Sequence, residues 1–363
     1  MTLILEDICV RRRGEIWLDD IDLELSDGMT TLIGPMGAGK TTLMRVAAGL
    51  DSPTSGRVVV NGKDVTSISA RTRSVAFVYQ QFINYPSLSV YENIASPLRQ
   101  ARTHTKGEID RRVREVAELM GIGELLGRKP AELSGGQQQR TAIARALARP
   151  VDVLLLDEPL ANLDYKLRER LRADLKDLFR DSPGVVLYST ADPAEALTFA
   201  APTVVLSQGR IERVGEVADM YHHPPTLRVA ATLSDPPLNL LPGVVREGRI
   251  ECLGAWLPAP RAQVSGRQVV LAVRPHQVSI VPGRPGALEF PAEIRLAEVT
   301  GGVTFLHLLV AGERHLVAQL PGPRLFEPGE PALAYVDPAH VFVFDESGGR
   351  LLAESAPEVD LHG

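Results

Sequence analysis

Hydrophobic residues in the first two thirds of the chain form two different patterns. The runs TTLI at 30–33, VDVLLLD at 151–157 and VVLY at 185–188 are short, and VDVLLLD is nearly all apolar, as expected of a strand buried on both faces. The segment 164–179 instead places four leucines on one helical stripe, with charged residues opposite. These leucines are Leu167, Leu171, Leu175 and Leu178. Strands that alternate with such helices predict an α/β domain built on a mostly parallel sheet.

Residues 83 to about 133 have a different pattern, with little strand signal. The segment 107–122 reads GEIDRRVREVAELMGI and has its apolar residues at helical spacing. The residues on this predicted buried face are Ile109, Val113, Val116 and Met120. We therefore expect a helical insertion within the α/β domain.

The pattern changes again near residue 222. The segment 222–243, HHPPTLRVAATLSDPPLNLLPG, is rich in proline and predicts a linker or a wrap at a domain edge. Beyond it, short apolar runs alternate with Gly and Pro, which predicts a small antiparallel β-barrel or sandwich. We therefore expect two domains, an α/β domain at 1–235 and an all-β, OB- or barrel-like domain at 236–363.

Composition and charge limit the classes of function. The 363 residues are 44% hydrophobic and 23% charged, with a net charge of -6, and they show no basic face or tail of the kind that nucleic-acid binders carry. The two cysteines, Cys9 and Cys252, have no metal-site spacing, which favours a reducing compartment such as the cytoplasm. No run approaches the ~18 apolar residues that span a bilayer. Any role at a membrane must therefore come through partners.

The segment LIGPMGAGKTT at 32–42 has the spacing of a phosphate loop (Walker A), between a predicted strand and a predicted helix. Glycines let backbone N–H groups approach phosphates closely, and the helix N-terminus adds its positive end. Lys40 can reach the β- and γ-phosphates, and the Thr41 hydroxyl can bind Mg²⁺. The predicted phosphate-binding residues are Gly34, Pro35, Met36, Gly37, Ala38, Gly39, Lys40, Thr41 and Thr42.

Two adjacent acids, Asp157 and Glu158, end the run VLLLDEP. A carboxylate at the end of a buried strand can hold Mg²⁺, and the next one can act as general base on an attacking water. We therefore predict Asp157 as a metal ligand and Glu158 as a catalytic residue.

The segment LSGGQQQR at 133–140 narrows the class of phosphate-loop protein. Ser134 can cap the helix that follows, and two glycines at a helix start leave N–H groups directed at an anion, so alone it indicates a phosphate contact or a capped helix. Between a phosphate loop and LLLDEP, it resembles the signature of ATP-binding cassette (ABC) ATPases. The signature residues are Ser134, Gly135, Gly136 and Gln137.

The resemblance extends over residues 3 to about 345. VYQQF is similar to the glutamine loop, with Gln80 at the glutamine position, and LANLD is similar to the loop after the catalytic glutamate, with Asp164 retained. The β-rich C-terminal part, with LAVRP and VFVFD, resembles the regulatory domain of carbohydrate-importer ATPases of the maltose and glycerol-phosphate class. QQFINYPSLSVYENIASPL and SDPPLNLLPG are most similar to ATPase subunits of bacterial glycerol importers.

The resemblance implies a mechanism and partners. Two cassettes pair head to tail, so that the signature at 134–137 serves the partner's ATP. Gln80 contacts Mg²⁺ or water as a catalytic and metal-site residue and couples the site to the helical insertion. The insertion offers a groove to a membrane permease subunit. Candidate groove residues are Phe82, Tyr85, Leu88 and Tyr91. The assembly has two permease subunits and an extracytoplasmic solute-binding protein, and this chain lies on the cytoplasmic face of the inner membrane.

The chain departs from the family pattern at two positions. The aromatic residue that stacks on adenine falls at Arg12 or a neighbour, and Trp17 lies too far along to match cleanly. A guanidinium plane can itself stack on adenine, so Arg12 is the candidate, with a solvated arginine as the alternative. The second departure is at 190–192, where the family has Thr-His-Asp and this chain has Thr190, Ala191 and Asp192. Loss of one preorganised group commonly costs ~10²–10³ in rate, so we expect slow hydrolysis at this site and a heterodimer with a second, histidine-bearing ATPase.

These observations favour an ATP-hydrolysing subunit of an ABC importer for glycerol or a similar polyol or sugar. Within this class, the alternative is a subunit of an importer for sn-glycerol-3-phosphate or another sugar. A nucleotide-binding regulatory subunit without hydrolysis of its own is a second alternative, because of Ala191, although Glu158 argues against it. A soluble cassette protein that acts on nucleic acid or ribosomes would be expected to have two cassettes or a basic extension.

Overall fold

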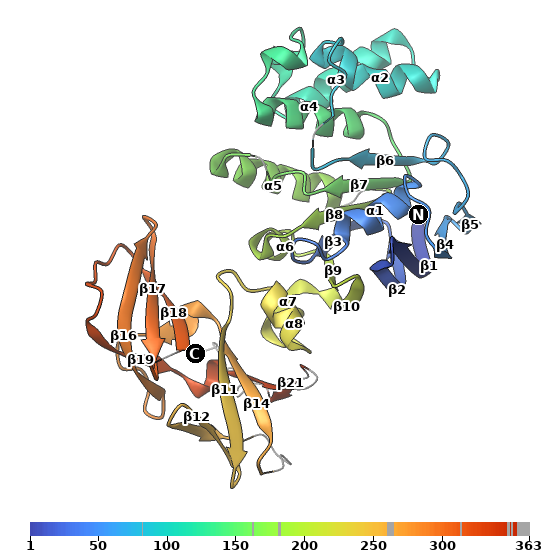
Figure 1. Cartoon of the computed structure of the whole chain (residues 1–363). Helices are drawn as coiled ribbons and strands as arrows, with labels where there is room; N and C mark the ends of the chain where they lie inside the picture. The colour runs from blue at the N-terminus through green and yellow to red at the C-terminus, as the bar shows by residue number, and fades with distance from the viewer. Residues whose placement is uncertain are drawn as a thin grey trace, which may run out of the picture. The chain divides into compact units, whose positions relative to one another are not determined.

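The computed structural model describes residues 1–81, 83–161, 163–180, 183–259, 265–312, 314–346, 349 and 351–353. The chain divides into two compact units, Met1–Ala218 and Asp219–Gly363 (Figure 1). The first unit is α/β and the second is all-β apart from short helices, so both predicted fold classes are confirmed. The expected domain boundary between residues 235 and 236 stays a prediction.

The centre of the first unit is a mostly parallel sheet with the order β10-β9-β3-β8-β7-β6. Its strands are β3 (Gly28–Ile33), β6 (Val75–Val78), β7 (Val153–Asp157), β8 (Val185–Thr190), β9 (Pro202–Ser207) and β10 (Arg210–Glu216). Every residue of β7 and β8 is buried, because helices cover both faces of a parallel sheet. The apolar runs therefore predict these strands correctly.

A second, antiparallel sheet in this unit has the order β2-β1-β4-β5. Its strands are β1 (Thr2–Arg12), β2 (Glu15–Ser26), β4 (Ser55–Val60) and β5 (Lys63–Asp64). One face of β1 and β2 shares a core with helix α1 (Lys40–Ala48), through residues such as Leu5, Leu43 and Met44. The expectation of a mostly parallel sheet did not include this layer, whose strands are buried only on alternate residues.

The predicted insertion is helical. Its helices are α2 (Val90–Ala101) and α3 (Lys106–Leu119), the short 3₁₀ turns η1 (Gly123–Leu125) and η2 (Pro130–Glu132), and the following helix α4 (Gly135–Ala148). Helices α2, α3 and α4 each begin with a capping box, formed by Ser89, Thr105 and Ser134. All four residues of the predicted buried face of 107–122 are buried, as the helical spacing predicts.

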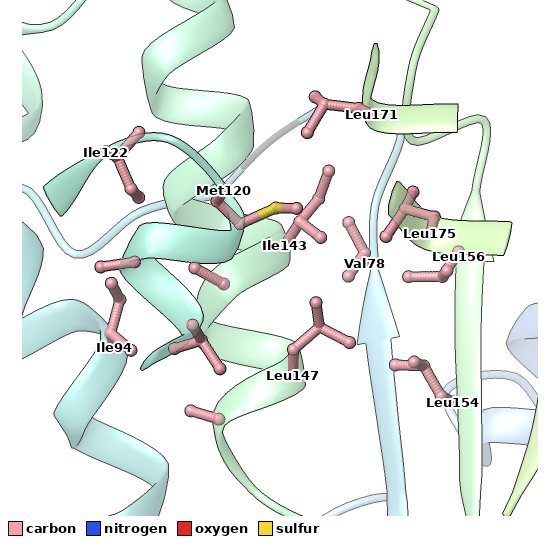
Figure 2. Close-up of a cluster of buried hydrophobic side chains, with 14 of the residues drawn as sticks. Val78, Ile94, Met120, Ile122, Ile143, Leu147, Leu154, Leu156, Leu171 and Leu175 are labelled. Atoms are coloured by element: carbon pink, nitrogen blue, oxygen red, sulfur yellow. The ribbon is translucent and has the colours of Figure 1, made fainter. Parts of the chain in front are cut away.

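Helix α4 joins the helical part to the parallel sheet. Figure 2 shows Ile143 of α4 between Met120 and Val78, within a buried cluster that also takes in Leu175. The remaining helices of this unit are α5 (Tyr165–Arg180), α6 (Pro193–Phe199) and α7 (Val217–His222), the last of which extends into the second unit. On α5 the predicted stripe is wrong at Leu178, which is 39% exposed, because Phe179 takes the buried position instead.

The second unit has two antiparallel sheets, with the orders β13-β12-β11-β14-β20-β21 and β15-β19-β16-β17-β18. The first contains β11 (Asn239–Arg246), β12 (Arg249–Cys252), β13 (Ala255–Pro258), β14 (Gln268–Val273), β20 (Phe342–Asp345) and β21 (Leu351–Ala353). The second contains β15 (Val278–Ser279), β16 (Leu288–Val299), β17 (Val303–Val310), β18 (Arg314–Pro321) and β19 (Pro331–Val336). One apolar core, which includes Leu271, Phe290 and Leu306, joins them.

The proline-rich segment 222–243 is more structured than a linker. It contains helix α8 (Leu227–Thr232), and its end forms the first half of β11, where Leu241 is buried. The short turns η3 (Pro275–Gln277) and η4 (Pro338–His340) complete the described elements. None of the helices in the described ranges is long and apolar enough to cross a membrane.

The packing of α4 against the sheet leads to a stability prediction. Ile143 is fully buried, so Ile143→Ala should lower the free energy of unfolding by about 2–5 kcal/mol, and Ile143→Val by about 0.5–1.5 kcal/mol. Leu178→Ala, at an exposed position, is the control and should cost under about 1 kcal/mol. Urea unfolding followed by circular dichroism measures these values. Equal costs for Ile143→Ala and Leu178→Ala would contradict the packing.

Candidate active site

The phosphate loop lies between the end of β3 and the start of α1. Gly37 and Gly39 have φ values of 80° and 105°, in the left-handed region that favours glycine. A Cβ on Gly34 would lie 2.2 Å from the carbonyl oxygen of Leu206. Gly39 has no side chain that could cap α1, so the first N–H groups of the helix stay open to an anion. The spacing of the glycines thus follows from the fold of the loop.

Lys40 is the first residue of α1, and its side chain is only 5% exposed. Its Nζ donates hydrogen bonds to the carbonyl oxygens of Gly34 at 2.6 Å and Pro35 at 3.2 Å. The same ammonium lies 3.3 Å from Oε1 of Glu158. The buried positive charge is therefore held over the loop by carbonyls and one carboxylate.

Asp157 is buried at the end of β7, where it joins two neighbouring segments. Its Oδ2 accepts a hydrogen bond from Thr41 Oγ1 at 2.8 Å, and its Oδ1 accepts one from Ser189 Oγ at 2.8 Å. Burial raises the pKa of Asp157, and these two hydrogen bonds partly oppose the effect. A nearby divalent cation would favour the ionised form.

Glu158, the residue after Asp157, has an unusual backbone conformation. Its φ is 46°, and its N–H donates to the carbonyl oxygen of Ser189 at 3.2 Å and to Ser189 Oγ at 3.1 Å. Gln80 Nε2 donates to Glu158 Oε2 at 2.9 Å. A strained residue of this kind is frequent at functional sites, where its surroundings hold it in place.

The residues around this position fit a magnesium ion by the chemistry of their donors. Thr41, Asp157 and Gln80 offer hydroxyl, carboxylate and amide oxygens, which are the ligands that Mg²⁺ prefers. The bond from Gln80 to Glu158 uses the amide N–H and leaves Oε1 as a candidate ligand. Phosphate-loop sites combine such ligands with waters and substrate phosphates rather than an all-protein cage.

Together these residues line one cleft of about 720 Å³. The cleft-lining residues are Glu15, Ile16, Trp17, Met36, Gly37, Ala38, Gly39, Lys40, Thr41, Thr42, Gln80, Glu158, Ala191, Gln208 and Gly209. Hence most of the predicted phosphate loop, Gln80 and Glu158 meet in one place. Asp157 lies behind Thr41 rather than on the cleft wall.

Ala191 is exposed within this cleft, and none of the described residues that line it is a histidine. The turn that carries Ala191 is well anchored: Thr190 Oγ1 donates to Glu195 Oε2 at 2.8 Å, and Tyr188 OH donates to the same oxygen at 3.1 Å. Asp192 caps α6 by accepting from the N–H of Ala194 at 2.8 Å. The turn is thus ordered, but the side chain of Ala191 ends at Cβ.

Trp17 is a cleft residue that sequence reasoning set aside. Residues of β2 alternate between buried and exposed, and Trp17 is 42% exposed beside buried Leu18. A Cβ on Gly39 would lie 3.0 Å from the carbonyl oxygen of Trp17, so the fold brings β2 against the phosphate loop. Arg12, the predicted adenine contact, does not line this cleft but lies against the Trp17 ring. A lone tryptophan on the open face of a strand is the sequence signal that could have found this position.

The signature residues lie elsewhere. Ser134 Oγ accepts from the N–H of Gln137 at 3.4 Å, and Gln137 Oε1 accepts from the N–H of Ser134 at 2.9 Å, so the pair starts α4. Asp164 starts α5 by accepting from the N–H of Leu167 at 3.0 Å. None of 134–137 or Asp164 is among the described residues that line the cleft.

A second pocket of about 400 Å³ lies between β6, α2 and α4. Tyr85 and Leu88 line it, and Arg145 lies 4.8 Å over the Tyr85 ring and donates to the carbonyl oxygen of Ile83 at 2.6 Å. Of the other two predicted groove residues, Tyr91 lines a different pocket and Phe82 lies outside the described residues.

Known proteins resemble this chain over nearly its full length. The sequence model described as ABC transporter matches residues 18–161, and that of the TOBE domain matches residues 271–344. The sn-glycerol-3-phosphate import ATP-binding protein UgpC of Cereibacter sphaeroides is 37% identical, over 96% of this chain and 99% of that protein. The trehalose/maltose import ATP-binding protein MalK of Thermococcus litoralis is 36% identical, over 92% and 94% of the two chains.

Solved structures resemble the first part of the chain. The dimeric post-hydrolysis state of the ATP-binding cassette MJ0796, bound to ADP and Pi, has a TM-score of 0.55 and 29% sequence identity. The similarity covers 59% of this chain and 98% of that one.

The buried carboxyl group of Glu195 gives a pH prediction. Burial raises its pKa, against the hydrogen bonds from Thr190 and Tyr188. A carboxyl group whose pKa is higher in the folded state stabilises most below its unfolded pKa, and this stabilisation is lost as pH rises through the folded pKa. The Glu195→Gln variant has no carboxyl group to ionise at this position. Its free energy of unfolding should therefore increase relative to that of the wild type as pH rises from about 4 to 7.

Urea unfolding across this pH range measures the difference, with the exposed Glu118→Gln as control. A difference between Glu195→Gln and wild type that stays constant with pH would contradict a raised pKa of Glu195.

Proposed function

The chain belongs to the ATP-binding cassette transporter family, and we propose that it is the ATP-hydrolysing subunit of an importer for glycerol or a similar polyol, sugar or glycerol phosphate. Family membership makes it an ATP-binding transport ATPase. The single observation that carries the proposed mechanism is the cleft in which Lys40, Gln80 and Glu158 meet.

In the proposed mechanism the phosphates of ATP bind the loop amides and Lys40. Negatively charged phosphates compete with Glu158 for the Lys40 ammonium, which frees the carboxylate to accept a proton from the attacking water. Gln80 donates a hydrogen bond to Glu158 and so orients the carboxylate toward the attacking water. Thr41, Asp157 and Gln80 would hold Mg²⁺, which stabilises charge on the transferred phosphoryl group. Trp17 would stack on the base, because it is the aromatic residue among the described residues that line the cleft.

The transported solute is chosen by the membrane and solute-binding subunits. Relatives named for sn-glycerol-3-phosphate import and for trehalose/maltose import support the wider class of polyols, sugars and their phosphates. Within this class we favour glycerol, because the stretches QQFINYPSLSVYENIASPL and SDPPLNLLPG are most similar to ATPase subunits of glycerol importers. We propose that the chain acts with two permease subunits and an extracytoplasmic solute-binding protein, at the cytoplasmic face of the membrane. The pocket that contains Tyr85 and Leu88 suits a cytoplasmic helix of a permease.

A second ATPase chain is part of the proposal. The signature at 134–137 and Asp164 do not line the chain's own cleft, which supports their serving ATP on a partner cassette. Ala191 leaves this cleft without an imidazole, so we propose that the partner is a non-identical, histidine-bearing cassette. A regulatory subunit that binds ATP without hydrolysis is the alternative that Ala191 favours.

The proposal predicts separate roles for Lys40 and Glu158. Lys40→Ala should weaken ATP binding by about tenfold or more, because the loop loses its buried positive charge. Glu158→Gln should keep ATP binding and lower phosphate release by about 10²–10⁴. Equilibrium binding of ATP and phosphate release by the assembled complex measure both, with the exposed Lys63→Ala as control. Unchanged ATP affinity in Lys40→Ala would overturn the assignment of the cleft.

The empty switch position predicts a gain of function. Ala191→His should raise phosphate release at this chain's own site by about tenfold or more, because it restores a preorganised group in the cleft. The gain should fall below about pH 6.5, where the imidazole protonates. Ala191→Ser adds a polar group without an imidazole and is the matched control. Equal rates for Ala191→His and Ala191→Ser in the assembled complex would contradict the prediction.

A further inference from the structure

Arg12 lies directly against the indole ring of Trp17. Its guanidinium carbon is 5.3 Å from the ring centroid, within the range of a cation–π contact. Trp17 lines the large cleft beside the phosphate loop, and it also lines a smaller cleft of about 410 Å³ together with Arg12, Arg13 and Glu15. The guanidinium therefore lies against the ring of a residue that also lines the phosphate-loop cleft.

The guanidinium of Arg12 is held by a chain of ion pairs. Its Nη2 lies 2.7 Å from Oδ2 of Asp51, which is largely buried. Arg45 donates to both oxygens of Asp51, from Nε at 2.8 Å and from Nη2 at 3.0 Å. Both arginines lower the pKa of Asp51, Arg45 the more strongly. A bidentate pair of this kind fixes direction as well as charge.

This chain of contacts ends on the helix that starts with the phosphate-binding lysine. Arg45 is in the last turn of α1, whose first residue is Lys40. Trp17, Arg12, Asp51 and Arg45 thus form a chain of contacts from the cleft to the phosphate-loop helix. The residues come from β2, β1, the loop after α1 and α1 itself.

The spacing decides which face of Trp17 is open to a base. A flat ring between two stacking groups needs roughly 3.5 Å on each side. The guanidinium carbon of Arg12 is only 5.3 Å from the centroid of the Trp17 ring, which is too close for a base to fit between them. A base therefore cannot lie between Arg12 and Trp17, and a base that stacks on the indole would use its opposite face.

We propose that Arg12 is a positioning residue for the base of the bound nucleotide, acting through Trp17. Its guanidinium holds the exposed indole in one orientation, and Asp51 and Arg45 align that orientation with the phosphate-loop helix. An exposed tryptophan ordered before binding loses less side-chain entropy when the base stacks on it. The inference rests on the proposed function, in which this cleft binds ATP.

The experiment compares a ligand that has a base with one that lacks it. Calorimetric titration of the full chain with ATP and with inorganic tripolyphosphate gives the two affinities. Arg12→Ala should weaken ATP binding about two- to fivefold and leave tripolyphosphate binding unchanged. Arg11→Ala removes the same charge one residue away and should leave the ratio of the two affinities as in the wild type. Arg12→Lys keeps the charge but not the planar fork, so ATP binding should weaken to a lesser degree.

A double-mutant cycle tests whether Arg12 acts through the indole. In the Trp17→Ala background, Arg12→Ala should cause no further loss of ATP affinity. Trp256→Phe leaves Trp17 as the single tryptophan of the chain, so its fluorescence reports the ring directly. Arg12→Ala in that background should shift the emission before any ligand is added.

Three results would overturn the inference. Equal weakening of ATP and tripolyphosphate by Arg12→Ala would show that only its charge matters. Additive losses in Arg12→Ala and Trp17→Ala would show that the two residues act separately. An unchanged ATP affinity in Arg12→Ala would show that Arg12 has no effect on nucleotide binding. Failure of the wild type to bind ATP at all would instead overturn the proposed function, so the two failures are distinguishable.

Discussion

The site depends on the buried carboxylate of Asp157 and its two hydrogen bonds. Asp157 ends β7, and it accepts from Thr41 on α1 and from Ser189 on the neighbouring strand β8. Burial of a carboxylate is unfavourable unless such donors compensate it. The two hydroxyls therefore connect the phosphate-loop helix to the ends of two strands. Glu158 follows directly and also donates its N–H to Ser189.

The phosphate side of the cleft and the turn at Ala191 are both held by direct contacts. The loop, Lys40, Gln80 and Glu158 are linked by direct contacts, so the phosphate side is ordered by the fold. The turn at Ala191 is equally well ordered by Thr190, Tyr188 and Glu195. Ala191 lines the cleft with a methyl group, where the proposed mechanism would use an imidazole.

The same fold separates the two halves of the proposed ATP chemistry. Ser134 starts α4, whose other residues pack against the sheet through Ile143 and Leu147 (Figure 2). The signature is thus rigidly joined to the core, although it does not line the chain's own cleft. A signature that does not line its own cleft is consistent with the proposal that it serves the ATP of a partner cassette. The all-β second unit belongs to the same family pattern, since a TOBE domain model matches 271–344.

The sequence by itself determined the α/β and all-β classes, the strands β7 and β8, the helical insertion, and the residues of the phosphate loop, because each depends on local spacing and burial periodicity. It also predicted Glu158 from its place after a buried strand, and Gln80 and the missing histidine at Ala191 by resemblance. These three residues line one cleft. Only the tertiary structure decided the contacts between distant segments. The antiparallel layer of β1 and β2, the buried Phe179 in place of Leu178, and Trp17 beside Gly39 all depend on which strand lies against which helix. Arg12 shows the reason most directly, because its partners Trp17 and Asp51 are selected by packing and not by any spacing along the chain.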